Sequence, residues 1–287
     1  MGEPTAFYEP DPDGSFVATD ATQGPWSPEL QHGGPPSALL VRAFEALIAA
    51  TARDGDPDGP PDGKPDGTPD SKPDGHLAKI AMDFHGPVPV GPVRVRASVL
   101  KPGRRAQLLA GELSVDGRVV LSARAWWRRR SPGLVPDVPV QAPPLPDPDD
   151  VVPADPLPGH LDHGWIASMD YRYLAGFVTT PGPATVWVRP KFPLVAGETT
   201  SGTQRAVLVS DGASGFSAAL DFRTHLFSNL DLVLSFLRPP VGPWVALDAV
   251  SALDGAGGGT TSTRLADTAG YHGFALQTLY VAPHHAV

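Results

Sequence analysis

Cysteine is absent from the 287 residues of this chain. Its absence excludes disulfide bonds, thiol nucleophiles and thiolate-bound metal ions together. The chain also lacks any run of about 20 apolar residues, the length that a membrane-spanning helix requires. Its first residues have neither the basic nor the apolar region of a secretory signal. We therefore expect a cytoplasmic protein without a membrane partner.

Positive charge is scarce as well. The sequence has 22 Lys and Arg against 31 Asp and Glu, which gives a formal net charge of −9. Much of this imbalance comes from residues 54–75, where seven aspartates stand against two lysines. Only residues 128–130, three consecutive arginines, are dense in positive charge. This distribution predicts no nucleic-acid partner.

Several catalytic signatures are missing. The segment Gly212–Gly215 comes closest to the Gly-x-Ser-x-Gly elbow of serine hydrolases but has the wrong spacing. Neither a GxxxxGK phosphate loop nor a GxGxxG segment after a strand is present. The histidine pairs His160/His163 and His284/His285 have no acidic partners nearby on a regular element. We therefore expect no metal ion and no cofactor.

Proline and glycine are abundant, with 35 and 31 residues, and are concentrated in two segments. Residues 54–75 repeat Pro-Asp-Gly, which prevents a regular helix and cannot build a core, so they are predicted to form a disordered insertion. Residues 131–159 contain ten prolines and are predicted to be a linker. The predicted organisation is an N-terminal domain over residues 1–130, this linker, and a C-terminal domain over residues 160–287.

The two stretches 87–127 and 239–281 resemble copies of one unit. Each opens with Val-Gly-Pro, continues as an alternating strand and a second strand, and reaches a last strand after a turn. Asp116-Gly117 and residues 267–270 provide the hairpin turns.

A helix is predicted before each copy, over residues 35–47 after Gly33-Gly34 and over residues 213–220 after Asp211-Gly212. A helix followed by antiparallel strands in each half predicts an α+β fold. Side-by-side pairing of the two halves would give one continuous sheet and remove exposed edges at the junction.

The segment Gln31-His32-Gly33-Gly34 at the start of the first predicted helix is a candidate site. The first backbone N–H groups of a helix have no partner within it and carry the positive end of its dipole. Glycine lets a ligand approach that backbone closely, so the site could polarise a carbonyl group. Alternatively, the glycines only permit tight packing between helix and sheet, and the sequence leaves both interpretations open.

Taken together, several short motifs resemble the type II acyl-CoA thioesterases of the double hot-dog superfamily. The resemblance covers nearly the whole chain except the Pro-Asp-Gly insertion and the linker. The matching segments are Gly24-Pro25-Trp26, Gln31–Pro36, Ala38-Leu39-Leu40, Asp83-Phe84 with Pro87, Gly103-Arg104-Arg105, Leu230-Asp231, Arg238-Pro239-Pro240 with Trp244, and Gly273–Gln277.

The resemblance implies a tandem hot-dog fold, in which each half wraps a curved antiparallel sheet around a long helix. It also implies that an Asp, a Thr or Ser, and a Gln of the C-terminal half bind and activate water. By motif position these are Asp231, Ser251 and Gln277. The hydroxyl residue is the least secure, because Ala252 would occupy its place if the register slipped by one. Asp211 is a rival acid, although capping of the following helix would also explain it.

These observations lead to the hypothesis that the protein hydrolyses an acyl thioester, as in lipid metabolism, to a carboxylic acid and a free thiol. Acyl-CoA is the expected substrate partner, and a carrier-protein thioester is left open. Asp231 would act as base or water anchor, and Ser251 and Gln277 would orient the water. Gly33 and Gly34 would polarise the carbonyl, with help from His32.

Two alternatives have the same fold: a non-catalytic acyl-thioester binding protein, and a hydratase-type or pathway-tailoring enzyme. One site per chain is expected, and assembly into a homodimer or a higher homo-oligomer is left open.

Overall fold

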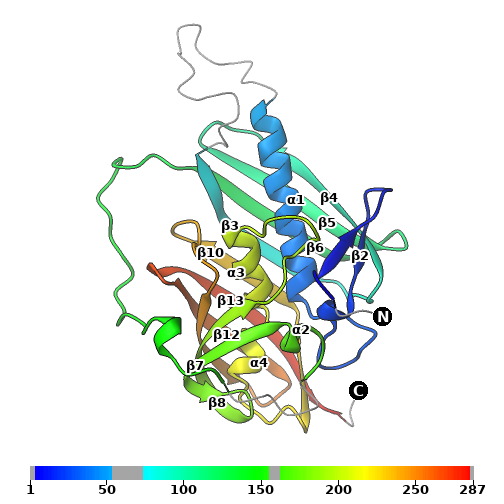
Figure 1. The fold of residues 1–287 in the computed structure, drawn as a ribbon, viewed down its shortest axis with the longest axis vertical. Helices are drawn as coiled ribbons and strands as arrows, with labels where there is room; N and C mark the ends of the chain where they lie inside the picture. Colours follow the sequence, from blue (N-terminus) through cyan, green and yellow to red (C-terminus); the bar gives the residue numbers. More distant parts are fainter. Residues whose placement is uncertain (1–3, 54–73, 155–161, 285–287) are drawn as a thin grey trace, which may run out of the picture.

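The computed structural model describes residues 4–53, 74–154 and 162–284, which form two helix-and-strand units (Figure 1). The first unit contains β1 (Tyr8–Pro10), β2 (Phe16–Ala18), the short 3₁₀ helix η1 (Asp20–Thr22), α1 (Gly34–Arg53), β3 (Gly75–Phe84), β4 (Pro92–Lys101), β5 (Ala106–Val115) and β6 (Arg118–Arg129). The second contains η2 (Pro148–Asp150), α2 (Gly164–Ala167), β7 (Met169–Phe177), β8 (Thr180–Pro190), α3 (Gly202–Ser210), α4 (Ala213–Phe216), β9 (His225–Asn229), β10 (Asp231–Phe236), β11 (Val245–Leu253), β12 (Gly258–Asp267) and β13 (Gly270–Pro283).

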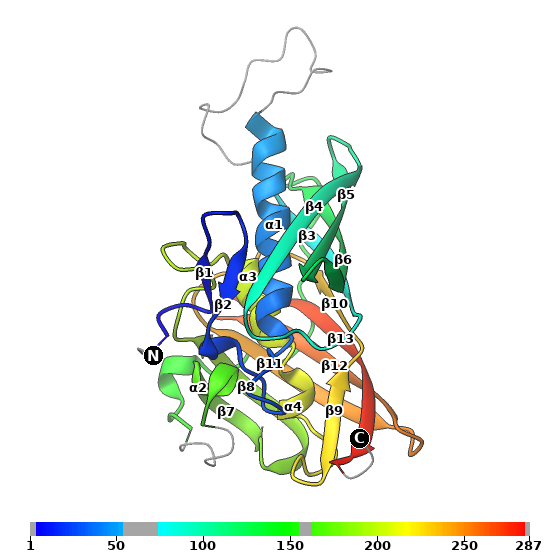
Figure 2. The same cartoon turned by 90° about the vertical axis from the view of Figure 1, so that its right-hand side faces the viewer.

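The strands form one 13-stranded sheet in the order β1-β2-β4-β5-β6-β3-β10-β13-β12-β11-β8-β7, with β9 pairing to β13. The two units meet where β3 and β10 pair antiparallel, with Asp83 opposite Asp231 and Ala81 opposite Val233. The expected side-by-side junction of the halves is therefore confirmed. The sheet curves around the helices, which lie on its inner face (Figure 2).

The longest helix, α1, begins where the sequence predicts. Two prolines follow Gly34 in its first turn, where their missing N–H groups cost no hydrogen bond. Leu39, Leu40 and Phe44 are buried, and the helix packs on β4, β5 and β6. A Cβ atom at Gly111 of β5 would lie 2.9 Å from the Phe44 ring, so this glycine allows the close approach of helix and strand. After Arg53 the predicted insertion follows, and its residues 54–73 lie outside the described residues, whereas Gly75 already belongs to β3.

In the second unit the counterpart of α1 is α3, which the sequence did not predict. Ser201 begins it with a capping box, in which its hydroxyl accepts from the Gln204 N–H. The predicted helix over residues 213–220 is wrong in length, because α4 ends at Phe216. There the Ser217 hydroxyl donates to the Ala213 carbonyl, which satisfies that group and helps to end the helix.

Helices α1 and α3 pack against each other and join the two halves inside the sheet (Figure 2). The Glu45 carboxylate accepts hydrogen bonds from Ser201 Oγ at 2.8 Å and from Gln204 Nε2 at 2.7 Å. At the other end of the contact, Gly34 lies against the carbonyl of Leu208 with no room for a Cβ atom. The start of α1 therefore lies beside the end of α3.

Both predicted hairpin turns are present. Asp116 and Gly117 adopt positive φ angles of 49° and 79° between β5 and β6. The β12–β13 turn closes between Asp267 and Gly270, and Asp267 accepts two hydrogen bonds from the guanidinium of Arg238.

The described part of the proline-rich segment lies partly on the second unit. Leu145 packs against a cluster containing Trp187 and Trp244, and Trp187 Nε1 donates to the Pro146 carbonyl at 3.0 Å. By contrast, Leu134 and Val138 are exposed. None of the helices in the described ranges is both long and apolar enough to cross a membrane.

Candidate functional site

A buried carboxylate, that of Asp211, lies directly after α3 at the centre of a polar cluster. Its side chain is only 4% exposed. Oδ1 accepts a hydrogen bond from Asn229 Nδ2 at 2.8 Å, and Oδ2 lies 3.0 Å from His32 Nδ1. Asp211 is the C-cap of α3, whereas the N-cap of α4 is Gly212, so the capping explanation for Asp211 is wrong.

Gln277 of β13 reaches the same place from the sheet. Its side chain is 2% exposed, and Nε2 donates to the main-chain oxygen of Asp211 at 3.0 Å. The other amide atom, Oε1, is buried and has no hydrogen-bond partner among the described residues. Because an unpaired buried acceptor is costly, this oxygen marks a position where a donor from a ligand or a water molecule would be stabilised.

Asn229, at the end of β9, was not among the candidates from the sequence. Its amide nitrogen donates to both the carboxylate and the main-chain oxygen of Asp211, and its Oδ1 accepts from Ser214 Oγ at 3.1 Å. Its inward direction follows from the alternation of residues along β9, because Asn229 lies two residues after the buried Phe227 and therefore on the same face of the sheet.

Ser251 lies near this cluster but makes no hydrogen bond to Asp211 or Gln277. Its hydroxyl is 2.8 Å from both Ser217 Oγ and Thr261 Oγ1. Thr261 is the direct cross-strand neighbour of Gln277 in the β12–β13 pair. Ser251 therefore lies two strands away from Gln277, in the middle of a chain of hydroxyl groups that runs from Ser217 to Thr261.

Asp231 lies on the other face of the sheet. Along β10, Leu232, Leu234 and Phe236 are buried and point inward, so Asp231 at the start of the strand points outward with Val233. Its carboxylate accepts a hydrogen bond from the main-chain N–H of Thr278 at 2.6 Å. The structure brings Gln277 together with Asp211 and not with Asp231.

His32 lies between Asp211 and an aromatic ring. Its imidazole stacks on Trp165, with ring centroids 3.9 Å apart and an angle of 3° between the planes. Nδ1 accepts from the Gly34 N–H at 3.2 Å and also lies 3.0 Å from the Asp211 carboxylate. His32 therefore lies between the Asp211 carboxylate and the first backbone N–H of α1.

Both glycines at the start of α1 are sites of close approach. A Cβ atom at Gly33 would lie 2.8 and 2.9 Å from the two carboxylate oxygens of Asp211. A Cβ atom at Gly34 would overlap the main-chain oxygen of Leu208. Gly34 therefore permits close packing, but against helix α3, whereas the packing interpretation expected the sheet. Pro35 and Pro36 have no N–H group, and that of Gly34 is directed at His32. The Gly33 N–H has no hydrogen-bond partner within the described ranges, so it remains available beside Asp211.

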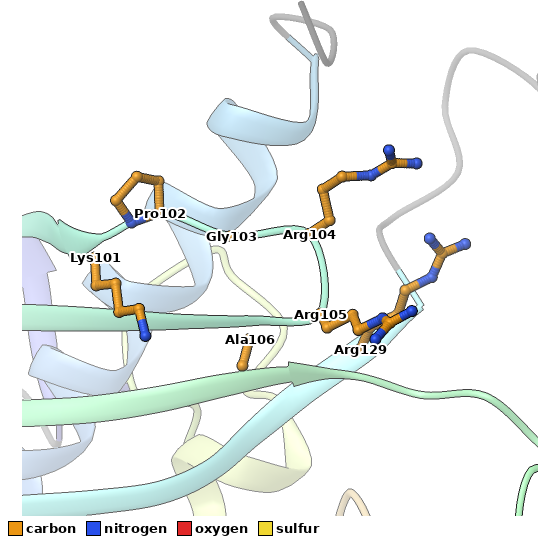
Figure 3. A pocket seen from close by; sticks show the side chains of 7 residues that line it. All are labelled: Lys101, Pro102, Gly103, Arg104, Arg105, Ala106 and Arg129. Carbon is orange, nitrogen blue, oxygen red and sulfur yellow. The ribbon is translucent and has the colours of Figure 1, made fainter. Parts of the chain in front are cut away.

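Two surface hollows lie apart from this cluster. One, of about 590 Å³, is lined mainly by apolar residues and glycines between Leu230 and Tyr280. The other, of about 710 Å³, lies at the turn between β4 and β5 (Figure 3).

The two histidine pairs of the sequence are only partly described. His163 precedes α2, and His284 Nε2 is 2.8 Å from the Phe222 carbonyl. His160 and His285 lie outside the described residues.

The fold and the polar cluster define the class of this protein as a tandem hot-dog protein with a buried carboxylate between its halves. Residues 22–128 match the acyl-CoA thioesterase N-terminal domain, and residues 139–281 match the acyl-CoA thioesterase C-terminal domain. The chain therefore belongs to the acyl-CoA thioesterase family. No curated protein matches the chain.

Solved structures share the fold over nearly the full length. A conserved hot-dog protein of unknown function from Alicyclobacillus acidocaldarius is 15% identical, with a TM-score of 0.66, and 93% of this chain and 92% of that one are covered. The tesB protein of Mycobacterium avium subspecies paratuberculosis is 14% identical with a TM-score of 0.62, covering 94% and 93%. The acyl-CoA thioesterase II of Mycobacterium marinum is 15% identical with a TM-score of 0.58, covering 98% and 96%. These likenesses support the double hot-dog architecture.

Proposed function

We propose that this protein hydrolyses acyl-CoA to a carboxylic acid and free CoA, with water activated by Asp211. The observation that carries the proposal is the pair formed by Asp211 and the buried, unpartnered Oε1 of Gln277. A carboxylate can accept one proton of a water molecule, and the amide oxygen can accept a hydrogen bond from the other. The two groups together would hold the water and direct its lone pair.

The carbonyl oxygen of the thioester would lie at the start of α1. There the free N–H of Gly33 adjoins Asp211, and the N-terminal end of the helix favours developing negative charge. Attack by water forms the carbon–oxygen bond while Asp211 takes one proton. Collapse of the tetrahedral intermediate breaks the carbon–sulfur bond and releases the thiolate, which takes up the proton from Asp211 and so regenerates the carboxylate. No step requires a covalent enzyme intermediate or a cofactor.

The neighbouring residues would hold Asp211 in place. Asn229 and His32 contact one carboxylate oxygen each, and Trp165 fixes the plane of the His32 ring. Asp211 thus replaces Asp231 as the proposed base, because the Asp231 carboxylate lies on the other face of the sheet and is bonded to a main-chain N–H. We propose that Ser251 supports the site only indirectly, by positioning Thr261 beside Gln277.

The test is thiol release from acyl-CoA substrates of graded chain length by the wild type, Asp211→Asn and Asp231→Asn. Asparagine keeps the size of the side chain but cannot accept a proton, so Asp211→Asn should lower kcat by about 10²- to 10⁴-fold. The matched variant Asp231→Asn should keep kcat within about threefold, because it changes an outward-facing carboxylate. Thermal unfolding of each variant checks that the fold is intact.

Two results would contradict this proposal. If the folded wild type cleaves none of the acyl-CoA substrates, the hydrolase function fails, and the binding-protein alternative gains support. If Asp231→Asn abolishes thiol release while Asp211→Asn does not, hydrolysis holds and the assignment of the base is wrong.

A further inference from the structure

The hollow at the β4–β5 turn is lined by four cationic side chains and no acidic one (Figure 3). It has a volume of about 710 Å³, which lies within the range of pockets that hold small molecules. The lining residues are Lys101, Pro102, Gly103, Arg104, Arg105, Ala106 and Arg129. This concentration of positive charge is unexpected in a chain with a net charge of −9.

The backbone holds two of these cations, Arg105 and Arg129, close together. The Arg129 N–H donates to the Arg105 carbonyl at 2.9 Å, which places Arg129, the last residue of β6, opposite Arg105, the residue before β5. A Cβ atom at Gly103 would lie 2.5 Å from the Ala106 carbonyl, so a glycine is needed for the tight turn that brings Lys101 and Arg105 to one hollow. Figure 3 shows the side chains of Arg105 and Arg129 side by side.

The charges of Arg105 and Arg129 are not neutralised by any carboxylate in the described ranges. Arg130, just outside the hollow, differs from them because Asp74 lies 3.8 Å away. Lys101 lies 5.8 Å from the ring centroid of Trp126, a contact that orients its ammonium group but does not neutralise it. Adjacent cations without counter-ions repel each other, and a bound anion with several negative charges would remove that repulsion.

We propose that this hollow is a binding site for a phosphorylated small molecule carrying several negative charges, of the size of a nucleotide. Guanidinium groups bind phosphate oxygens in a bidentate way, and two of them side by side fit a ligand with two phosphate groups. Because all four cations are exposed to solvent, the binding is electrostatic and weakens as salt is added.

The position of the hollow allows two sources for such a ligand. Strand β3 connects the hollow with the proposed site. Its first residue, Gly75, pairs with Arg129. The ring of its last residue, Phe84, lies beside Gly33. A ten-residue strand spans about 30 Å, so the hollow is far from Asp211. Only the nucleotide end of a fully extended CoA could approach it from a thioester at Asp211. The other source is a separate phosphorylated molecule, such as a free nucleotide.

The first measurement is calorimetric titration with adenosine 3′,5′-bisphosphate, a probe that carries the phosphate groups without a thioester. We compare the wild type with the double variant Arg105→Gln/Arg129→Gln and with a control double variant, Arg118→Gln/Arg124→Gln. The control replaces two exposed arginines outside the hollow and therefore removes the same amount of charge. Binding should weaken at least about tenfold in the first pair and less than about twofold in the control. Equal weakening in both pairs, or no binding to the wild type, would overturn the proposal.

A kinetic measurement distinguishes the two sources. If the hollow holds the nucleotide end of the CoA substrate, the bisphosphate inhibits acyl-CoA hydrolysis competitively, with an inhibition constant equal to its dissociation constant. If the ligand is a separate molecule, saturating bisphosphate leaves the KM for acyl-CoA unchanged. The CoA source rests on the proposed function, whereas the calorimetric titration requires no turnover and fails or succeeds independently of it.

Discussion

His272, buried near the start of β13, should make the protein sensitive to mild acid. The residue is 0% exposed, neither ring nitrogen has a hydrogen-bond partner among the described residues, and the ring stacks on Phe236. Burial lowers its pKa to about 4; the nearby Asp267 carboxylate opposes this shift, while the charge of Arg238 adds to it. The folded state therefore keeps His272 neutral at pH values where the unfolded chain binds a proton at its ordinary pKa of about 6.5.

The size of the effect follows from these two pKa values. Above about pH 6.5 the residue is neutral in both states and contributes no pH dependence. Between about pH 6.5 and pH 4 the unfolded state binds more protons, so stability falls as the pH falls, by up to about 1.4 kcal/mol per pH unit. Going from about pH 7.5 to pH 5.0, His272 should lower the free energy of unfolding by about 2 kcal/mol.

The assay is urea denaturation at these two pH values, for the wild type and for His272→Leu. Leucine keeps an apolar contact with Phe236 and removes the titrating ring, so the variant should lose about 2 kcal/mol less than the wild type on acidification. His76, whose pKa burial also lowers, contributes equally to both proteins and cancels in the comparison. His85→Leu, at an exposed histidine, is the matched control and should keep the wild-type pH dependence. The explanation is refuted if His272→Leu and the wild type lose the same free energy of unfolding between the two pH values.

Two further substitutions test the close contacts around the site and the β12–β13 turn. Gly33→Ala would place a methyl group 2.8 Å from the Asp211 carboxylate, so it should destabilise the fold by about 1–3 kcal/mol and lower kcat. The control Gly86→Ala meets no atom within 4 Å and should change neither thermal unfolding nor thiol release. Asp267→Asn breaks a pair with an arginine at a side chain that is 1% exposed, and should cost about 3 kcal/mol in urea denaturation. Asp248→Asn, in a more exposed arginine pair, should cost less than about 1 kcal/mol, and equal losses at the two aspartates would contradict the dependence on burial.

The start of α1 could be predicted from the sequence because local chemistry determines it. Two glycines followed by two prolines and an apolar run define a helix start without knowledge of the tertiary structure. The hairpin turn at Asp116-Gly117 is determined in the same way, by residues that tolerate positive φ. By contrast, α3 begins with Gly202 and is short, and its apolar pattern depends on packing against α1. Such tertiary stabilisation leaves a weak signal in the sequence.

The site could be predicted only in part. Gln277 lies beside Asp211, the alternative acid that the sequence offered. The alternation of strand residues, with Leu232 and Leu234 on one face and Val233 on the other, indicates that Asp231 is on the outward face with Val233. The contact between His32 and Asp211 could not be foreseen, because 179 positions separate these residues and only the packing of α1 on α3 brings them together. The division of the chain at residues 131–159 and the disorder of residues 54–73 stay predictions.

The proposed site draws on both halves of the chain. The first half supplies His32 and Gly33 at the start of α1, and the second supplies Asp211, Asn229 and Gln277. Neither set is complete without the other, since the carboxylate reaches His32 only because α1 and α3 lie in contact. The absence of a side chain at Gly34 allows that contact, and the bonds of Glu45 to the start of α3 fix its register. Changes along this helix pair, far from any substrate, should therefore alter the distance between His32 and Asp211 and with it the rate of hydrolysis.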